Sequence, residues 1–436
     1  MTRNSLFRFT GAFSSLSHEE KATLLERTSR DDADVRATVS AIISRVREGG
    51  DAAIRELSVE LDCVELKDIE VPTDQLRRAF DALSPDLRRA MERAAANITT
   101  FHESQKPELS SIIIEPGIVV GRRPDPLGRV GVYAPGGRAV YPSSVLMGAI
   151  PARIAGVGEV ILCSPPTPNG LPAESILAAA HIAGVDRVFA IGGAGAIAAM
   201  CLGTATVPRT DKVVGPGNAY VAEAKLQLAR AAAFDSPAGP SELLVIADAS
   251  ANPDVIAREV LAQAEHDPDA VVLVVTIGTD IASAIEAVIS SSIPLARRST
   301  IIAQSLADRG GVISATSTTE AVAISNAFAP EHLLIATSDP RAILDLVRNA
   351  GTVFLGETSS VAFGDYMTGA NHVLPTGGLA RSYSGLSTLD FIRWTSFQSV
   401  TTEAASRLAC DVAVLASAEG LHAHAATSLA WAGTGK

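Results

Sequence analysis

At about 100 to 200 residues per domain, the 436 residues of this chain predict two to four domains, each with its own hydrophobic core. Lysine and arginine number 36 against 48 aspartates and glutamates, so the formal net charge is −12 and no basic field exists to hold the phosphates of a nucleic acid. Charged residues make up only 19% of the chain, below the usual quarter, which indicates that much surface is hidden inside domains or between subunits.

The first part of the chain predicts helices and then a hairpin. Residues 31–48 repeat apolar side chains at helical spacing, and the pattern stops at Gly49 and Gly50. No functional site is expected in this helical region. Two β-branched runs, 112–114 and 118–120, then flank a Glu-Pro-Gly turn, which predicts a β-hairpin.

Short β-branched runs next alternate with alanine-rich helical segments in two series. The first series predicts strands at 130–133, 159–163, 187–191 and 212–214. The second predicts strands at 243–247, 271–276, 311–313, 333–335 and 352–355. Such alternation is typical of βαβ units, so we expect two open α/β domains with parallel sheets that bind ligands at the C-terminal ends of their strands.

Residues 356–388 interrupt this alternation and are rich in Gly, Ser, Thr and Asn. A long stretch without regular structure is usually functional, so we expect a binding loop there. A helix-prone segment from 399 to 430 closes the chain. Four cysteines far apart in the sequence, with no long apolar run, predict a cytoplasmic protein with reduced, buried thiols and no membrane span.

A glycine-rich motif follows the strand predicted at 187–191. The string GAGAIA at 193–198 fits G-x-G-x-x-A and opens a helix, which is a moderate indication of a dinucleotide site. Tight packing of an alanine-rich helix is the alternative explanation. Two further strand-end loops, 134–137 and 215–218, are expected at the same sheet edge and favour a nucleotide-sized ligand.

Several later residues have the chemistry of a site, and each also has an ordinary explanation. Gln263 and His266 share a predicted helix face that suits a divalent metal or a plain surface helix end. Glu331 and His332 join a carboxylate to an imidazole where a helix meets a strand, which suits proton transfer or a solvated strand entry. Asp365, in the polar loop, is a ligand or a turn residue.

Near the C-terminus, Glu419, His422 and His424 are predicted to lie on one helix. Glu419 and His422 at i, i+3 also suit a surface salt bridge. Spacing alone does not distinguish the two histidines.

The order of these segments resembles the histidinol dehydrogenase family over nearly the whole chain, from about residue 20 to residue 430. No single motif is specific, but their joint order is. The strings that carry the resemblance are RVGVYAPGG (129–137), YPSSVLM (141–147), DKVVGPGNAY (211–220), AGPSE (238–242), QAEH (263–266), APEH (329–332), GDY (364–366) and NHVLP (371–375).

The resemblance implies a zinc- and NAD-dependent enzyme that oxidises L-histidinol to L-histidine through L-histidinal. Its implied acid–base residues are Glu331 and His332. The implied ligands of one Zn2+ per subunit are Gln263, His266, Asp365 and His424. The implied substrate-binding residues are Ser241, Gln263, His266, His332, Asp365, Glu419 and His424. The implied NAD+ contacts are Tyr133, Gly195 and Asn218.

The resemblance also implies two incomplete, doubly wound Rossmann-like domains with small helical terminal pieces. Residues 28–132 with 242–385 are expected to form the first domain, and residues 133–241 the second, which contacts NAD+. The terminal pieces, 1–27 and 386–436, are expected to make an intertwined homodimer in which the C-terminal segment of one subunit completes the site of the other.

Gly195 departs from the family pattern, which has glutamine at this position. The apparent G-x-G-x-x-A motif arises from that difference, so we do not interpret it as a dinucleotide fingerprint. Loss of one side-chain hydrogen bond costs about 0.5 to 1.5 kcal/mol, which predicts NAD+ binding weakened several-fold but not abolished.

Two other functions remain open from the sequence. A relative with the same machinery would oxidise another small polar primary alcohol, since pocket preference is poorly readable from sequence. A metal-assisted hydrolase is a different class, although the chain lacks the H-E-x-x-H motif of the commonest zinc hydrolases. Formation of NADH distinguishes the dehydrogenases from the hydrolase.

Overall fold

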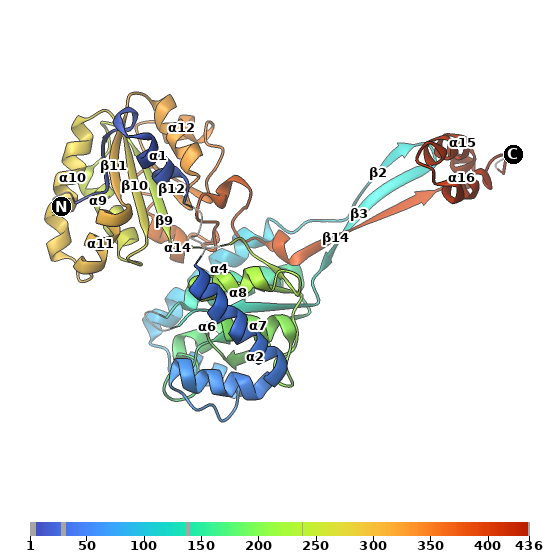
Figure 1. Cartoon of the computed structure of the whole chain (residues 1–436), viewed down its shortest axis with the longest axis horizontal. Helices are drawn as coiled ribbons and strands as arrows, with labels where there is room; N and C mark the ends of the chain where they lie inside the picture. Colours follow the sequence, from blue (N-terminus) through green and yellow to red (C-terminus); the bar gives the residue numbers. More distant parts are fainter. Residues whose placement is uncertain (1–5, 28–31, 137–139, 238, 435–436) are drawn as a thin grey trace.

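The structure is a computed structural model that describes residues 6–27, 32–136, 140–237 and 239–434. Two parallel sheets are flanked by helices, and a three-stranded antiparallel sheet extends from them as an arm (Figure 1). The predicted α/β class is confirmed.

The first parallel sheet has five strands in the order β6-β5-β4-β7-β8. They are β4 (Arg129–Tyr133), β5 (Glu159–Ser164), β6 (Arg187–Ala190), β7 (Lys212–Val214) and β8 (Ala233–Phe234). One face packs against α2 (Ala33–Leu57), α7 (Gly193–Leu202) and α8 (Ala219–Gln227). The other packs against α3 (Thr73–Ala82), α4 (Pro85–Glu103), α5 (Pro142–Ala155) and α6 (Glu174–Ile182). Because strand side chains alternate, Val160 and Ile161 enter opposite cores.

The second parallel sheet has six strands in the order β1-β11-β10-β9-β12-β13. They are β1 (Phe9–Ala12), β9 (Glu242–Ala247), β10 (Val271–Ile277), β11 (Gly311–Ala315), β12 (His332–Ala336) and β13 (Thr352–Leu355). One face packs against α9 (Pro253–Ala264), α10 (Asp280–Ser292) and α11 (Ser299–Arg309). The other packs against α1 (His18–Leu25), α12 (Thr318–Phe328) and α13 (Pro340–Leu344).

Both sheets have the same strand connectivity, and a short link joins one sheet to the other. Leaving β1 aside, each sheet has the strand order 3-2-1-4-5 of a Rossmann-like unit. Residues 235–241 connect β8, at an edge of the first sheet, directly to β9, near the middle of the second. At no more than about 3.6 Å per residue, this link holds the amino end of β9 within about 29 Å of the carboxyl end of β8.

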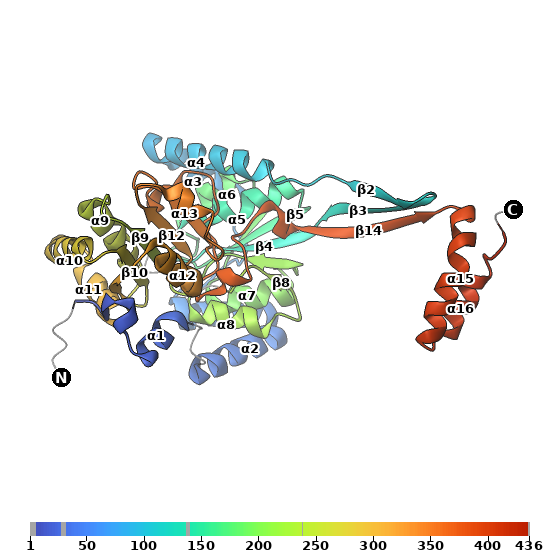
Figure 2. The same cartoon turned by 90° about the horizontal axis from the view of Figure 1, so that it is seen from above.

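The arm consists of β2 (Ser110–Glu115), β3 (Ile118–Pro126) and β14 (Ile392–Val400). β2 pairs antiparallel with β3, as the hairpin prediction requires, and β14 pairs with the other edge of β3. Two helices, α15 (Thr402–Ala418) and α16 (His422–Leu429), lie at its tip. Figures 1 and 2, seen from perpendicular directions, both show this tip far from the two parallel sheets.

The packing differs from the expected division of the chain. The helices between residues 33 and 103 pack on the first sheet, whereas the expectation joined residues 28–132 to 242–385. The apolar stripe of α2, which includes Val39 and Ile42, is buried together with α7 and α8. β1, from the expected terminal piece 1–27, instead extends the second sheet.

The helix stop predicted at Gly49 and Gly50 is confirmed as a break in α2, because Gly50 adopts φ 53°, a non-helical conformation, before a second helical stretch continues to Leu57. Two other local expectations need correction. β14 lies in the terminal piece, where no strand was predicted. The predicted C-terminal helix is divided at Gly420, whose φ is 77°, so Glu419 and His422 belong to different helices.

The four cysteines differ in their burial. Cys163 and Cys201 are buried as expected, whereas Cys63 and Cys410 are exposed, which corrects the prediction for those two. Among the described residues, no helix combines the length and apolar character needed to cross a bilayer.

Candidate functional site

Glu331 and His332 lie at the amino ends of the second sheet's central strands. Glu242 begins β9 and His332 begins β12, and the two strands are paired neighbours. Immediately before them, Ala329 ends α12 with φ 52°, a left-handed conformation that residues other than glycine rarely adopt. The site therefore forms at the edge opposite to the one that the general rule for parallel sheets predicts.

The Glu242 backbone holds both candidate acid–base residues. Its N–H donates to Oε2 of Glu331 at 2.7 Å, and its carbonyl lies 2.9 Å from Nδ1 of His332. Because a carbonyl only accepts hydrogen bonds, Nδ1 carries the proton. In the neutral imidazole, the lone pair is then on Nε2, which lies 3.3 Å from Oδ1 of Asp365 without hydrogen-bonding geometry.

The pKa values of this cluster are shifted by burial and by mutual charge. Glu331 is 6% exposed, and burial raises the pKa of its carboxyl above the usual value. Burial opposes the protonated form of His332, but the charges of Glu331 and Asp365 outweigh it and raise the pKa of the imidazole. Burial opposes ionisation of Asp365, but the neighbouring His332 prevails and lowers the pKa of that carboxyl.

Asp365 lies on a short helix within the predicted loop, α14 (Val361–Tyr366). At the start of α14, the Val361 N–H donates to Oε2 of Glu259 on α9 at 3.1 Å. At its end, Nδ1 of His372 donates to the Asp365 carbonyl at 2.8 Å. These two hydrogen bonds hold Asp365 beside α9 and beside β12.

Gln263 lies in the last turn of α9, and His266 follows just after its C-cap. Asn252 caps the start of this helix and Pro253 occupies its first turn. Since α9 runs back along the sheet after β9, its C-terminal end returns to the amino edge of the strands. Gln263 is 3% exposed and its side-chain Nε2 has no hydrogen-bond partner among the described residues, whereas His266 is exposed.

The buried Nε2 of Gln263 is a hydrogen-bond donor without a partner among the described residues, which indicates a polar ligand here, and the Oε1 of the same amide is the atom able to bind a metal. With an amide, an imidazole and a carboxylate from Gln263, His266 and Asp365, the donor types fit zinc, which favours nitrogen and oxygen ligands. Within one copy of the described chain, however, no three His, Cys, Asp or Glu side chains gather closely enough to hold a metal ion. Gln263 is outside that residue set, and the fourth expected ligand, His424, lies on α16 at the tip of the arm.

The remaining expected residues are divided between the sheet linker and the arm. Ser241 immediately precedes β9, next to the acid–base pair, and is partly buried. Glu419 ends α15 and His424 lies on α16, and both are exposed. The arm holds these two residues away from the site of their own chain (Figures 1 and 2).

The residues expected to contact NAD+ lie at the carboxyl edge of the first sheet. Tyr133 ends β4, is 3% exposed, and accepts a hydrogen bond from the Gly193 N–H at 3.0 Å. Burial raises the pKa of this phenol to about 12, so it stays protonated at neutral pH. The Asn218 side chain caps α8 by accepting from the Val221 N–H at 3.1 Å, which leaves its NH2 group as a donor.

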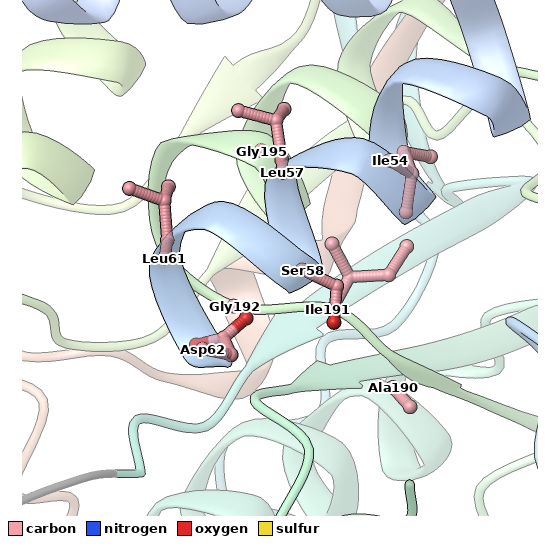
Figure 3. Close-up of a pocket in the computed structure, with 9 residues that line it drawn as sticks. All are labelled: Ile54, Leu57, Ser58, Leu61, Asp62, Ala190, Ile191, Gly192 and Gly195. Carbon is pink, nitrogen blue, oxygen red and sulfur yellow. The ribbon is translucent and has the colours of Figure 1, made fainter. Parts of the chain in front are cut away.

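Gly195 lines a small pocket between α2, the turn that follows α2 and the start of α7 (Figure 3). A Cβ added at Gly195 would be 3.7 Å from Leu57, an ordinary contact, so this position accommodates a side chain. Asp62 ends the π-helical turn that follows α2 and lines the same pocket, which places a pocket in the region where no site was predicted.

Sequence reasoning missed three contributors to this arrangement. Glu242 acts through its backbone, which no side-chain pattern reveals. His372 was part of a recognised string without a role, yet it contacts Asp365. Glu259 resembles any polar position of an amphipathic helix. Glu242 and Glu259 are buried and His372 is partly buried, and this signal appears only in the folded chain.

Comparisons with known proteins agree over nearly the full length. A model of the histidinol dehydrogenase family matches residues 25–430. The histidinol dehydrogenase of Methanosarcina barkeri is 46% identical over 413 residues, which cover 94% of this chain and 95% of that protein. The one from Natronomonas pharaonis is 48% identical over 415 residues, covering 95% and 97%. The crystal structure of histidinol dehydrogenase from Elizabethkingia anophelis superimposes with a TM-score of 0.93 at 35% identity and covers 98% of both chains.

Proposed function

Because the chain belongs to the histidinol dehydrogenase family, we propose that it oxidises L-histidinol to L-histidine through L-histidinal, with zinc and NAD+ in the cytoplasm. It is a dehydrogenase of histidine biosynthesis. The observation that carries the mechanism is the convergence of Glu331, His332 and Asp365 at one buried edge.

His332 is the proposed base that removes the hydroxyl proton as the alcohol is oxidised. Its Nδ1–H is held by the Glu242 carbonyl, which aims the Nε2 lone pair of the neutral ring at the site. Engagement of Asp365 by a cation weakens its hold on the protonated imidazole and favours the neutral form.

Glu331 is the proposed base for the second oxidation. L-histidinal must be hydrated before it is oxidised to the acid, so a water molecule has to lose a proton. Burial raises the pKa of Glu331, which makes its carboxylate a better proton acceptor than an exposed one. Its hydrogen bond from the Glu242 N–H fixes the carboxylate beside His332.

Gln263, His266, Asp365 and His424 are the proposed zinc ligands. When bound, zinc supplies a Lewis acid that holds the substrate's nitrogen atoms and positions its alcohol carbon. Ser241 lies close enough along the chain to bind the same substrate, and Glu419 would pair with a basic nitrogen. Because Glu419 and His424 lie on the arm, we assign them to the site of a second copy of the chain.

Exposed apolar side chains on the arm support this homodimer. The β2 residues Ile112, Ile113 and Ile114 are 63%, 73% and 55% exposed, and Val414 and Leu415 on α15 are 69% and 68% exposed. Apolar surface of this extent usually marks a protein contact. A second copy that buries the arm also brings its Glu419 and His424 to the incomplete donor set, as closed two-fold symmetry allows.

Tyr133, Asn218 and the backbone at Gly195 are the proposed contacts of NAD+, which accepts a hydride in each oxidation. The two sheets supply different parts of the reaction. The carboxyl edge of the first sheet holds the cofactor, and the amino edge of the second holds the acid–base pair, joined by residues 235–241.

A stoichiometric assay tests the proposal. Purified protein is mixed with L-histidinol and NAD+, with and without a chelator, and both NADH and histidine are followed. We expect two NADH per histidine, and loss of activity with the chelator that added zinc restores. Formation of NADH from other small polar alcohols but not from L-histidinol would reject the substrate, and chelator-resistant turnover would reject the metal.

A further inference from the structure

A buried ion pair joins the N-terminal segment to the edge that carries the acid–base residues. Nε and Nη2 of Arg27 donate to the two carboxylate oxygens of Glu242, both at 3.0 Å. The two side chains are only 6% and 3% exposed. A bidentate guanidinium–carboxylate pair fixes orientation as well as distance, which a pair formed with lysine does not.

Other contacts fix the ion pair from several elements. The Gly377 N–H, from the segment after α14, donates to Oε1 of Glu242 at 2.9 Å. Nη2 of Arg27 also donates to the Phe328 carbonyl at 2.8 Å, and its guanidinium lies 3.3 Å from the centre of the Phe328 ring. Phe328 ends α12, just before Ala329 turns the chain toward β12, the strand that begins at His332.

The position of the pair gives it a role beyond holding two segments together. The Glu242 side chain is fixed by Arg27, while the Glu242 backbone donates to Glu331 and accepts from His332. Movement of this one residue would therefore displace both acid–base groups and release the proton of Nδ1 from its acceptor. Groups that orient the residues of a site commonly affect activity by 10- to 100-fold.

We propose that Arg27 and Glu242 are positioning residues for the acid–base pair, and that the ion pair sets the orientation and tautomer of His332 through the Glu242 backbone. The inference rests on the proposed roles of Glu331 and His332. A buried ion pair is weak evidence for stability, since well-packed apolar residues often stabilise as much, and this favours a positioning role for it.

The test separates positioning from folding with graded variants. Arg27→Lys keeps the positive charge but loses the bidentate geometry, and Arg27→Ala removes the cation. Glu242→Gln removes the negative charge of the carboxylate. Arg187→Ala is the control for bidentate geometry, because Arg187 pairs with Glu70 through two bonds of 2.7 Å on the first sheet, with side chains 32% and 38% exposed and therefore less buried than the Arg27–Glu242 pair. Each variant is measured for kcat, KM, zinc content and folded fraction by circular dichroism.

We expect Arg27→Ala to lower kcat by about 10-fold or more, with KM for L-histidinol and zinc content within about twofold of the unmodified protein. Added guanidinium ion should restore part of kcat in Arg27→Ala. The kcat of Arg27→Lys should lie between the values of Arg27→Ala and of the unmodified protein. Arg187→Ala should keep kcat. Should Arg27→Ala not fold, Arg27→Lys and Glu242→Gln carry the same test.

Two results would overturn the inference. One is a folded Arg27→Ala protein whose kcat is unchanged, and the other is a loss of activity that merely follows the unfolded fraction and does not respond to guanidinium. Failure of the proposed acid–base roles is recognised separately. In that case, the His332→Asn and Glu331→Gln proteins would retain activity, whatever the effect of the Arg27 variants.

Discussion

The chemistry of His332 depends on which of its two nitrogens carries the proton, and a backbone atom makes that choice. The Glu242 carbonyl is closer to Nδ1 than is the Glu331 carboxylate, at 2.9 Å against 3.4 Å. The nearer group, the Glu242 carbonyl, accepts the hydrogen bond from Nδ1–H, and Glu331 instead accepts one from the Glu242 N–H. This difference is consistent with the separate tasks that we propose for the imidazole and the carboxylate.

Replacing His332 by asparagine tests the first task. His332→Asn keeps a hydrogen-bond donor for the Glu242 carbonyl but removes the base, so kcat should fall by about 10²-fold or more. Zinc content, measured by atomic absorption, should not change because His332 is not a proposed ligand. Near-normal turnover at neutral pH would reject His332 as the base.

Glu331→Gln tests the second task. The amide still accepts a hydrogen bond from the Glu242 N–H but takes no proton from water, so oxidation of L-histidinal should slow more than oxidation of L-histidinol. Single-turnover measurements that start from each substrate compare the two steps. Equal slowing of both steps would argue that Glu331 only holds the site together.

Gly195→Gln tests the departure from the family pattern. A Cβ at Gly195 would make only an ordinary contact, 3.7 Å from Leu57, so a glutamine side chain can start there without a clash. NAD+ should bind several-fold more tightly by titration calorimetry, since one hydrogen bond contributes about 0.5 to 1.5 kcal/mol. Gly195→Ala is the control, because it stabilises the helix without adding a donor; equal affinities of the two variants would show that the amide is immaterial.

At the scale of elements, predictability depends on whether local pattern or distant packing decides the structure. Strands such as β5 and β10 were predictable because they are continuous β-branched runs between turn signals. β14 was not, because most of it is exposed and its partner β3 lies about 270 residues away. Glu331 and His332 were identifiable by type and by their place at a strand entry, but the sequence did not show that the backbone of Glu242, about 90 residues away, contacts both.

A second buried ion pair, between Lys225 and Asp235, holds the loop that carries Asn218. Nζ of Lys225 donates to the Gly215 carbonyl and to Asp235, both at 2.6 Å, while the Gly215 N–H donates to Asp235 at 2.7 Å. Gly215 has φ 120°, and a Cβ there would be 2.1 Å from the Tyr133 carbonyl oxygen. The pair therefore fixes a loop that only glycine can form.

Asp235→Ala should leave the Lys225 ammonium buried without a counter-ion. Loss of one partner of a buried pair costs about 3 to 5 kcal/mol, so the free energy of unfolding in urea should fall by that amount. Arg309→Ala, which breaks an exposed pair with Asp269, should cost less than about 1 kcal/mol. Similar losses in the two variants would contradict the role of burial.

At the scale of the whole molecule, the proposed dimer would make the active site a property of two chains. Within one described chain, the body supplies Gln263, His266 and Asp365, while Glu419 and His424 lie at the tip of the arm. A dimer in which arms exchange partners would bury the exposed apolar residues of β2 and complete both sites. Each site then has one body and one arm, from different chains.

This arrangement predicts complementation between two inactive variants. His332→Asn damages only the body, and His424→Ala damages only the arm and should lower zinc content. In a mixed dimer, the body of the His424→Ala chain and the arm of the His332→Asn chain form one intact site. The isolated mixed dimer should then have about half of the unmodified activity, because one of its two sites is intact.

Subunit exchange is measured by co-expressing the two variants with different affinity tags and isolating the doubly tagged dimer. The control pairs His332→Asn with Glu331→Gln, since both lie in the body and every mixed site remains defective. Activity in the first pair and none in the second is possible only if each site takes residues from two chains. If the first pair is no more active than its parent variants, each chain must complete its own site. The arm would then have to fold back onto its own body, unlike its extended position in this structure.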